Sequence, residues 1–151
     1  MHHLNSLGST GTYILCLKLS SLTDITIGNL GRFNFEEGWY AYVGSAFGPG
    51  GLKARLRHHL YNRAKPRWHI DYLKVHIQMM HVWFSTDPQR LECIWARQLA
   101  KLEVSGQPVP GFGSSDCHCP THLFHFNKML PPAGFLHHLR KLNFHGKPSS
   151  D

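Results

Sequence analysis

Two apolar segments in the first third of the chain most constrain its fold, because both have the composition of buried β-strands. Thr12–Leu19 (TYILCLKL) is rich in β-branched and large apolar side chains. Trp39–Ser45 (WYAYVGS) alternates so that Tyr40 and Tyr42 share one face, opposite Val43. The segments therefore predict two strands, with Tyr42 near the end of the second.

Hydrophobic periodicity after the second strand predicts helices and one more strand. A glycine-rich turn at residues 48–51 precedes the first helix. The remaining expected elements are a short hairpin near residues 24–35, helices over Leu52–Arg63 and Trp68–Ile77, a strand over Met79–Ser85, and a helix that begins with Asp87 as N-cap and Pro88 in its first position. These strands are too few for a doubly wound parallel sheet. We therefore expect an α+β fold, in which a small three-stranded antiparallel sheet and a short extra hairpin are flanked by helices.

Length and charge narrow the possible functions. The 151 residues suit one domain, assigned to residues 10–126, and a basic C-terminal tail over 127–151 that is expected to be a short helix or disordered. Lysine and arginine number 16 against 9 acidic residues, and this net charge of +7 favours a polyanionic partner such as nucleic acid. No apolar run approaches the roughly 20 residues needed to span a bilayer, and the start does not have the pattern of a secretory leader. We therefore expect a cytoplasmic protein without a membrane partner.

An arginine and a histidine lie four residues apart in the first predicted helix, so their side chains share one face. Arg55 and His59 flank the apolar stripe of that helix and therefore point toward the body of the protein. A cation held there can stabilise negative charge that develops on a phosphate. A neutral histidine can act as a base toward water. The alternative is an ordinary basic helix with a packing histidine.

Two tyrosines can meet at the same end of the sheet. Tyr13 begins the first strand and Tyr42 ends the second, so antiparallel pairing would bring these ends together. Both hydroxyls could then donate to a phosphate or orient a water. Tyr40 is expected to be a core residue, and Gly44 fits a position where a substrate or a helix approaches the backbone closely.

Elimination among the nine acidic residues leaves three candidates for the ligand of a hard metal ion. The others lie in turn-like segments, at helix ends or in the tail. Asp71, Glu92 and Asp116 remain, and Glu92 stands beside the apolar stripe of the third helix. A single carboxylate with waters and a substrate phosphate makes an ordinary Mg²⁺ site. Taken alone, an acidic residue near a helix N-terminus is explained by the helix dipole.

A second group of possible ligands follows the third helix. It contains Cys117, His118, Cys119, His122 and His125. These side chains suit zinc, but the Cys-x-Cys spacing differs from the usual zinc knuckle and no second pair follows at a standard distance. We therefore expect a loop whose Cys and His side chains pack or bind phosphate, with structural Zn²⁺ as the alternative. The remaining cysteines, Cys16 and Cys93, are expected to be small buried hydrophobes.

The order of these motifs resembles the core of the GIY-YIG endonuclease superfamily, and more narrowly its Uri-type stand-alone branch. The resemblance covers most of residues 11–126. The segments that carry it are GTYILCL, GWYAYVGSAFGPGGLKARLRHH, WHIDYL, RLECIWA and GFGSSDCHCPTHLF. The chain departs from the pattern in having Thr12 and Val43 in place of the name-giving isoleucines, a longer gap between the two tyrosines, and no clear counterpart of the downstream asparagine.

The resemblance implies a metal-dependent endonuclease that hydrolyses phosphodiester bonds in DNA with Mg²⁺ or Mn²⁺. It implies catalytic roles for Tyr13, Tyr42, Arg55, His59 and Glu92, with Glu92 as the metal ligand. The basic residues expected to track the DNA backbone are Lys53, Arg57, Arg63, Lys65 and Arg67. Two alternatives stay open: a non-catalytic nucleic-acid-binding module on the same scaffold, and a zinc-stabilised interaction protein built around Cys117–His125.

Overall fold

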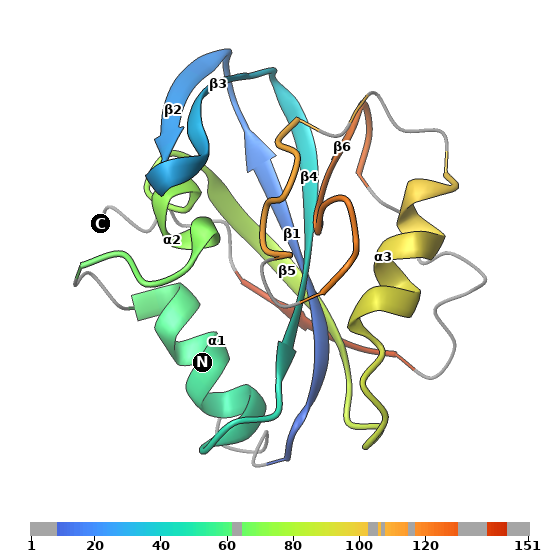
Figure 1. Ribbon diagram of the computed structural model, residues 1–151. Helices are drawn as coiled ribbons and strands as arrows, with labels where there is room; N and C mark the ends of the chain where they lie inside the picture. Colours follow the sequence, from blue (N-terminus) through green and yellow to red (C-terminus); the bar gives the residue numbers. More distant parts are fainter. Residues whose placement is uncertain are drawn as a thin grey trace.

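The computed structural model describes residues 9–61, 65–102, 106, 108–114, 117–129 and 139–144. Its main feature is a five-stranded antiparallel sheet in the order β6-β4-β1-β5-β7 (Figure 1). The strands are β1 (Gly11–Leu19), β4 (Gly38–Ala46), β5 (Gln78–Ser85), β6 (Leu123–Phe126) and β7 (Arg140–Asn143). A separate hairpin pairs β2 (Thr23–Ile27) with β3 (Gly31–Phe35) through a 3₁₀ turn at Gly28–Leu30. The expected α+β class and the extra hairpin are confirmed.

The inner strands are those that the apolar segments predicted, and their pairing brings two tyrosines together. β1 and β4 pair so that Tyr13 lies opposite Gly44, and Leu15 lies opposite Tyr42. Alternate residues of paired strands share one face of the sheet, so Tyr13 and Tyr42 are diagonal neighbours. Their ring centroids are 6.4 Å apart.

The sheet is covered on both faces, and each face has its own apolar core. α1 (Gly51–Tyr61) and α2 (His69–Leu73) lie on one side together with the hairpin, and α3 (Glu92–Ala100) lies on the other (Figure 1). Leu15 enters the core that contains the apolar residues of α1, and its neighbour Ile14 enters the core that contains those of α3. Adjacent residues of β1 therefore serve different cores, as the two-residue period of a strand requires.

The main sheet has five strands where three were expected, because two short segments join its edges. β6 pairs with β4, and all of its residues are buried. β7 pairs with the outer edge of β5, although the sequence around it predicted a short helix or a disordered tail. Only Leu142 of β7 is even partly buried. The pattern of β7 therefore has too little apolar alternation to predict a strand.

Two helices are shorter than their periodicity predicted. α2 stops before Val75, which is 66% exposed. α3 begins at Glu92 rather than at Pro88. Asp87 closes a local turn before the helix, in which its Oδ1 accepts a hydrogen bond from the Gln89 backbone N–H at 2.8 Å. Glu92 therefore becomes the first residue of α3.

Among the described residues, no helix has both the length and the apolar character needed to cross a membrane. The longest, α1, has 11 residues, against the roughly 20 that a bilayer-spanning helix needs.

Candidate functional site

A polar cavity of about 240 Å³ lies beside β4, near the point where β6 begins. β6 pairs with β4 only as far as Tyr42. The backbone carbonyl of Ser45, further along β4, therefore accepts a hydrogen bond from a side chain instead of from β6. The residues that line the cavity are Tyr42, Ser45, Arg55, Arg67, Trp68, His69, Glu92, Gly113, Cys117 and His122. They come from β4, α1, the start of α2, the start of α3 and the loop before β6. The cavity thus gathers parts of the chain that are far apart in sequence.

Three of the five residues expected to be catalytic line this cavity. They are Tyr42 from β4, Arg55 from α1 and Glu92 at the first position of α3. Tyr13 and His59 are almost completely buried and lie behind Tyr42, with their rings in contact with its ring. The structure therefore places all five in one neighbourhood, three on the cavity wall and two beneath it.

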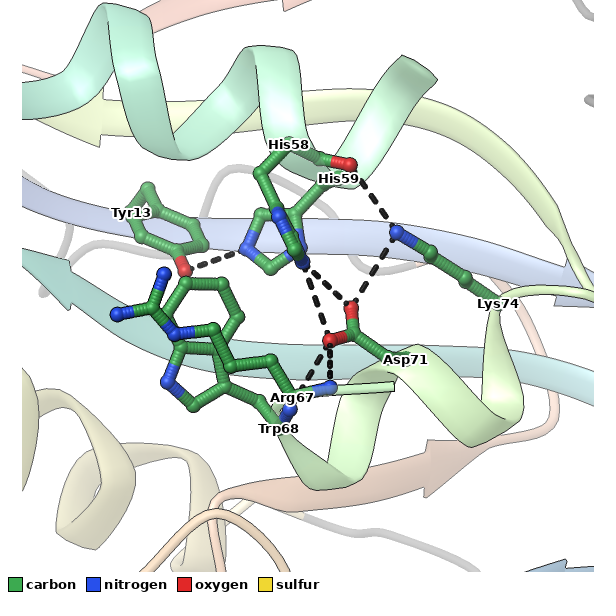
Figure 2. Close-up of polar contacts among 7 residues, drawn as sticks. All are labelled: Tyr13, His58, His59, Arg67, Trp68, Asp71 and Lys74. Atoms are coloured by element: carbon green, nitrogen blue, oxygen red, sulfur yellow. Dashed lines mark hydrogen bonds and ion pairs between the residues drawn. The ribbon is translucent and has the colours of Figure 1, made fainter. Parts of the chain in front are cut away.

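A buried tyrosine–histidine pair supports the wall at Tyr42. The Tyr13 hydroxyl and His59 Nε2 are 2.7 Å apart (Figure 2). Burial lowers the pKa of His59 to about 3, so its imidazole is neutral at physiological pH. Burial also raises the pKa of both phenols, Tyr13 and Tyr42. The pair is therefore a neutral hydrogen bond inside the protein rather than a base in contact with water.

Two arginines stack on one tryptophan at the cavity wall. The guanidinium carbons of Arg55 and Arg67 lie 4.2 and 4.9 Å from the Trp68 ring centroid. Arg55 Nη1 also donates a hydrogen bond to the Ser45 backbone oxygen at 2.9 Å. The ring and this hydrogen bond fix the Arg55 guanidinium in position without neutralising its charge. The wall therefore presents two positive charges to any anion that enters.

Asp71 holds the segment that carries this tryptophan. Its Oδ2 accepts hydrogen bonds from the backbone N–H groups of Arg67 and Trp68 at 2.8 and 2.9 Å (Figure 2). Its Oδ1 is 3.0 Å from His58 Nε2 and 3.2 Å from Lys74 Nζ. Burial raises the pKa of the Asp71 carboxyl, but the backbone and side-chain donors lower it by more, to about 2. Because both oxygens are already engaged, this candidate for the metal ligand has a structural role instead.

His69 is a cavity residue that the sequence did not mark. Its Nδ1 accepts a hydrogen bond from the Gly113 backbone N–H at 2.8 Å. The neutral ring must then carry its proton on Nε2. Partial burial lowers the pKa of His69, which favours this neutral form. His69 therefore adds a hydrogen-bond donor to the wall, and no local pattern marked it because its partner Gly113 lies far away in the sequence.

A compact group of sulfur and nitrogen ligands adjoins the cavity next to Glu92. The ligand atoms of Cys93, Cys117, Cys119 and His122 all lie within 4.8 Å of one another. Burial, followed by the neighbouring thiols of Cys93 and Cys117, raises the pKa of Cys119 to about 12. Thiol and imidazole groups gathered this closely can hold a metal ion.

The membership of this group differs from the one expected. Cys93 was expected to be a small buried hydrophobe, but it is only partly buried and belongs to the group. His125 was expected near Cys117, but its Nε2 is instead 2.9 Å from the Glu37 carbonyl oxygen, and His118 is exposed. Cys93 lies on α3, far from the other ligands in sequence, so no local spacing could have indicated its membership.

His122 connects this group to Glu92. Its Nε2 is 3.3 Å from Cys117 Sγ, and its Nδ1 is 3.1 Å from Glu92 Oε2. The second contact has the distance of an ion pair but not the geometry of a hydrogen bond, so we describe it as an electrostatic contact. Burial lowers the pKa of His122, but Glu92 and Cys117 outweigh this and raise it above its ordinary value. One imidazole therefore touches both the thiol group and the carboxylate of the cavity.

The basic residues expected to track DNA lie in several places. Arg67 lines the cavity, whereas Lys53, Arg57 and Lys65 lie outside its wall at partly or fully exposed positions. Arg63 lies outside the described residues, as does Asp116, the third candidate for the metal ligand. Of the four expected DNA-tracking residues that the structure describes, Arg67 is therefore the one that lines the cavity.

Comparisons with known proteins show the family of the chain. No curated protein and no solved structure matches it. A family model described as a domain of unknown function, DUF123, matches residues 12–143. This range contains all three described helices and every residue that lines the cavity. The chain therefore belongs to the DUF123 family.

Proposed function

We propose that the protein is a metal-dependent endonuclease that hydrolyses phosphodiester bonds in DNA. The observation that supports this most is the meeting of Tyr42, Arg55 and Glu92 on one cavity wall, from three separate elements. A hydroxyl donor, a fixed cation and a carboxylate are groups that serve phosphodiester hydrolysis with a hard cation. The net charge of +7 adds long-range attraction for a polyanion.

Glu92 is the residue that would hold the cation. Its side chain is 26% exposed, and the one close polar contact from the described residues is that of His122 Nδ1 with Oε2. One carboxylate, with waters and substrate phosphate oxygens, suits Mg²⁺ or Mn²⁺, because these ions prefer oxygen ligands and retain water. When bound, such a cation supplies Lewis-acid polarisation of the phosphate.

Side chains of the cavity wall take the remaining tasks. Arg55 offers a fixed positive charge to the phosphate oxygens as negative charge develops in the transition state. Tyr42 and His69 offer hydrogen-bond donors that orient the phosphate or the attacking water. Arg67 contacts the neighbouring phosphate backbone, which positions DNA without reading its sequence.

Tyr13 and His59 contribute from behind the wall. With a pKa of about 3, His59 is too weak a base to take a proton from water directly. We therefore assign it the role of a positioning residue, whose ring holds the Tyr13 hydroxyl at 2.7 Å. The two rings in turn pack against Tyr42, with centroids 6.4 and 6.3 Å from its own.

A plasmid-nicking assay with added Mg²⁺ or Mn²⁺ tests this proposal. Glu92→Gln and Arg55→Ala should each reduce nicking by about 10²- to 10³-fold, because each removes a charge that the transition state needs. Glu37→Gln and Arg97→Ala are matched controls at exposed positions outside the cavity, and their rates should stay close to that of the wild type. Nicking by folded Glu92→Gln at the wild-type rate would refute the assignment.

Binding of nucleic acid without cleavage is the second candidate function. The wall made by Arg55, Trp68 and Arg67 favours it, because stacked guanidinium and indole groups bind phosphates and bases without a metal ion. An electrophoretic shift assay in the presence of a chelator measures such binding. Wild-type protein that binds DNA in this assay but does not nick it with either cation would be a binding module.

A further inference from the structure

We propose that Cys93, Cys117, Cys119 and His122 form a closed, tetrahedral zinc site that joins α3 to the loop before β6. Their ligand atoms lie within 4.8 Å of one another, and all three cysteines are free of disulfide bonds. Three thiolates and one imidazole are an established ligand set for structural Zn²⁺. The site is independent of the proposed nuclease function, because its four ligands would bind the ion whether or not DNA is cut.

The geometry of the group fits one shared ion. Zinc bonds of about 2.3 Å to sulfur and about 2.0–2.1 Å to nitrogen place neighbouring tetrahedral ligands roughly 3.5 Å apart. Cys117 Sγ and His122 Nε2 are 3.3 Å apart. The Cys119 backbone N–H points at Cys117 Sγ from 3.4 Å, where it would stabilise a thiolate. Four protein ligands leave no position for water or substrate, so the ion would be structural.

Packing alone does not explain these cysteines. Cys16 is 2% exposed within a hydrophobic core, as a cysteine that serves only as a small apolar side chain should be. Cys93, Cys117 and Cys119 are each partly exposed, and Cys117 lines the polar cavity. A zinc ion would tie the start of α3 to the loop that forms one wall of the cavity.

The same site would position Glu92. His122 would bind zinc through Nε2 while its Nδ1 faces Glu92 Oε2 at 3.1 Å. A carboxylate behind a zinc-bound histidine fixes the orientation of the ring, and the ring fixes the carboxylate in return. Glu92 also precedes Cys93 directly in α3. Zinc would therefore hold the cavity carboxylate from two sides, through the backbone of Cys93 and through the ring of His122.

The metal content of the full chain, purified under reducing conditions, tests the site. Wild-type protein should carry one zinc ion per chain, and Cys117→Ser and His122→Ala should lose it. Cys16→Ala is the matched control, because it removes a cysteine outside the group and should keep the zinc. Binding turns each thiol into a thiolate and releases its proton to the buffer. Reconstitution with Co²⁺ should give the visible spectrum of tetrahedral cobalt with thiolate ligands in the wild type and in Cys16→Ala only.

Two outcomes would overturn the site. One is a folded wild-type chain that contains no zinc and takes up neither Zn²⁺ nor Co²⁺ on reconstitution. The other is an equal loss of metal from Cys16→Ala and Cys117→Ser. Because both readouts are independent of DNA cleavage, the zinc site and the nuclease proposal can fail separately.

The link to Glu92 has its own test, in which a chromophoric chelator competes for the zinc. Glu92→Gln should weaken zinc binding by about 10- to 100-fold, because it removes the carboxylate behind the histidine ligand. Glu37→Gln should leave the zinc affinity unchanged, since its side chain is exposed and outside the group. An unchanged zinc affinity in Glu92→Gln would overturn the coupling between zinc and the cavity.

Discussion

At the scale of single residues, Gly44 shows how a missing side chain shapes the site. A Cβ at this position would lie 2.4 Å from the Tyr13 hydroxyl. The Tyr13 ring can therefore cross the β4 backbone only because residue 44 is glycine. The sequence predicted a close approach here by a substrate or a helix, but the group that approaches is the neighbouring tyrosine. Gly113 has the same relation to Tyr42, because a Cβ there would lie 2.9 Å from the ring.

Gly44→Ala should displace the Tyr13 ring and lower the free energy of unfolding by about 1–3 kcal/mol, the usual cost of overpacking a core. Gly48→Ala is the control, because its Cβ would meet nothing within 4 Å, and the change there should stay within about 0.5 kcal/mol. Urea unfolding followed by tryptophan fluorescence measures both. Equal stabilities for the two variants would show that the Tyr13 ring is free to move aside.

At the scale of elements, apolar periodicity predicted the inner strands and α1 but not the edges of the sheet. The sequence of β1 alone predicts a strand, because a strand that is buried on both faces has a long run of apolar residues. β6 and β7 have only four residues each, and β7 is largely exposed. Their strand conformation depends on pairing with β4 and β5, which no local pattern reports. The start of α3 also lies later than predicted, and the hydrogen bond that Asp87 accepts closes a separate turn before the helix.

The start of α2 depends on the Asp71 carboxylate, which makes this element sensitive to acid. The pKa of Asp71 is about 2 in the folded protein, against an ordinary value of 3.8. Because folding lowers this pKa, the resulting stabilisation is fully present above about pH 4 and is lost as the pH falls through about 2. The shift corresponds to about 2 kcal/mol.

Asp71→Asn should remove this pH dependence. Between about pH 5 and pH 2, the free energy of unfolding of the variant should therefore fall by about 2 kcal/mol less than that of the wild type. Asp24→Asn is the control, because the Asp24 carboxylate is 47% exposed and its ion-pair partner among the described residues is the exposed Arg32, at 3.4 Å. Urea unfolding at a series of pH values gives the three profiles. If the free energy of unfolding of the wild type falls with pH in parallel to that of Asp71→Asn, the Asp71 carboxylate is not the source of the acid sensitivity.

At the scale of the whole molecule, the site lies at the edge of the sheet, where contributions from its two faces meet. α1 and α3 lie on opposite faces of the sheet (Figure 1). They bring Arg55 and Glu92 to one cavity, which Tyr42 of β4 also lines. The motif order predicted that Tyr42, Arg55 and Glu92 would share one site. It could not show that Tyr13 and His59 lie behind the wall, because that depends on how closely the strands and α1 pack.

The position of each positive charge on the molecule should appear in the salt dependence of DNA binding. An arginine that neutralises a phosphate releases condensed counterions, which contributes about 0.9 to the slope of log affinity against log salt for duplex DNA. Arg67→Ala should therefore reduce this slope by about 0.9 and weaken binding evenly across sequences. Arg97→Ala removes the same charge from the net +7, but at an exposed position of α3 outside the cavity, so its slope should match that of the wild type.

Fluorescence anisotropy with a labelled duplex over a range of NaCl concentrations, without divalent cations, measures both variants. Equal reductions in slope would mean that DNA responds to the overall charge of the protein and not to the Trp68 wall, because the two variants differ only in where the charge is lost.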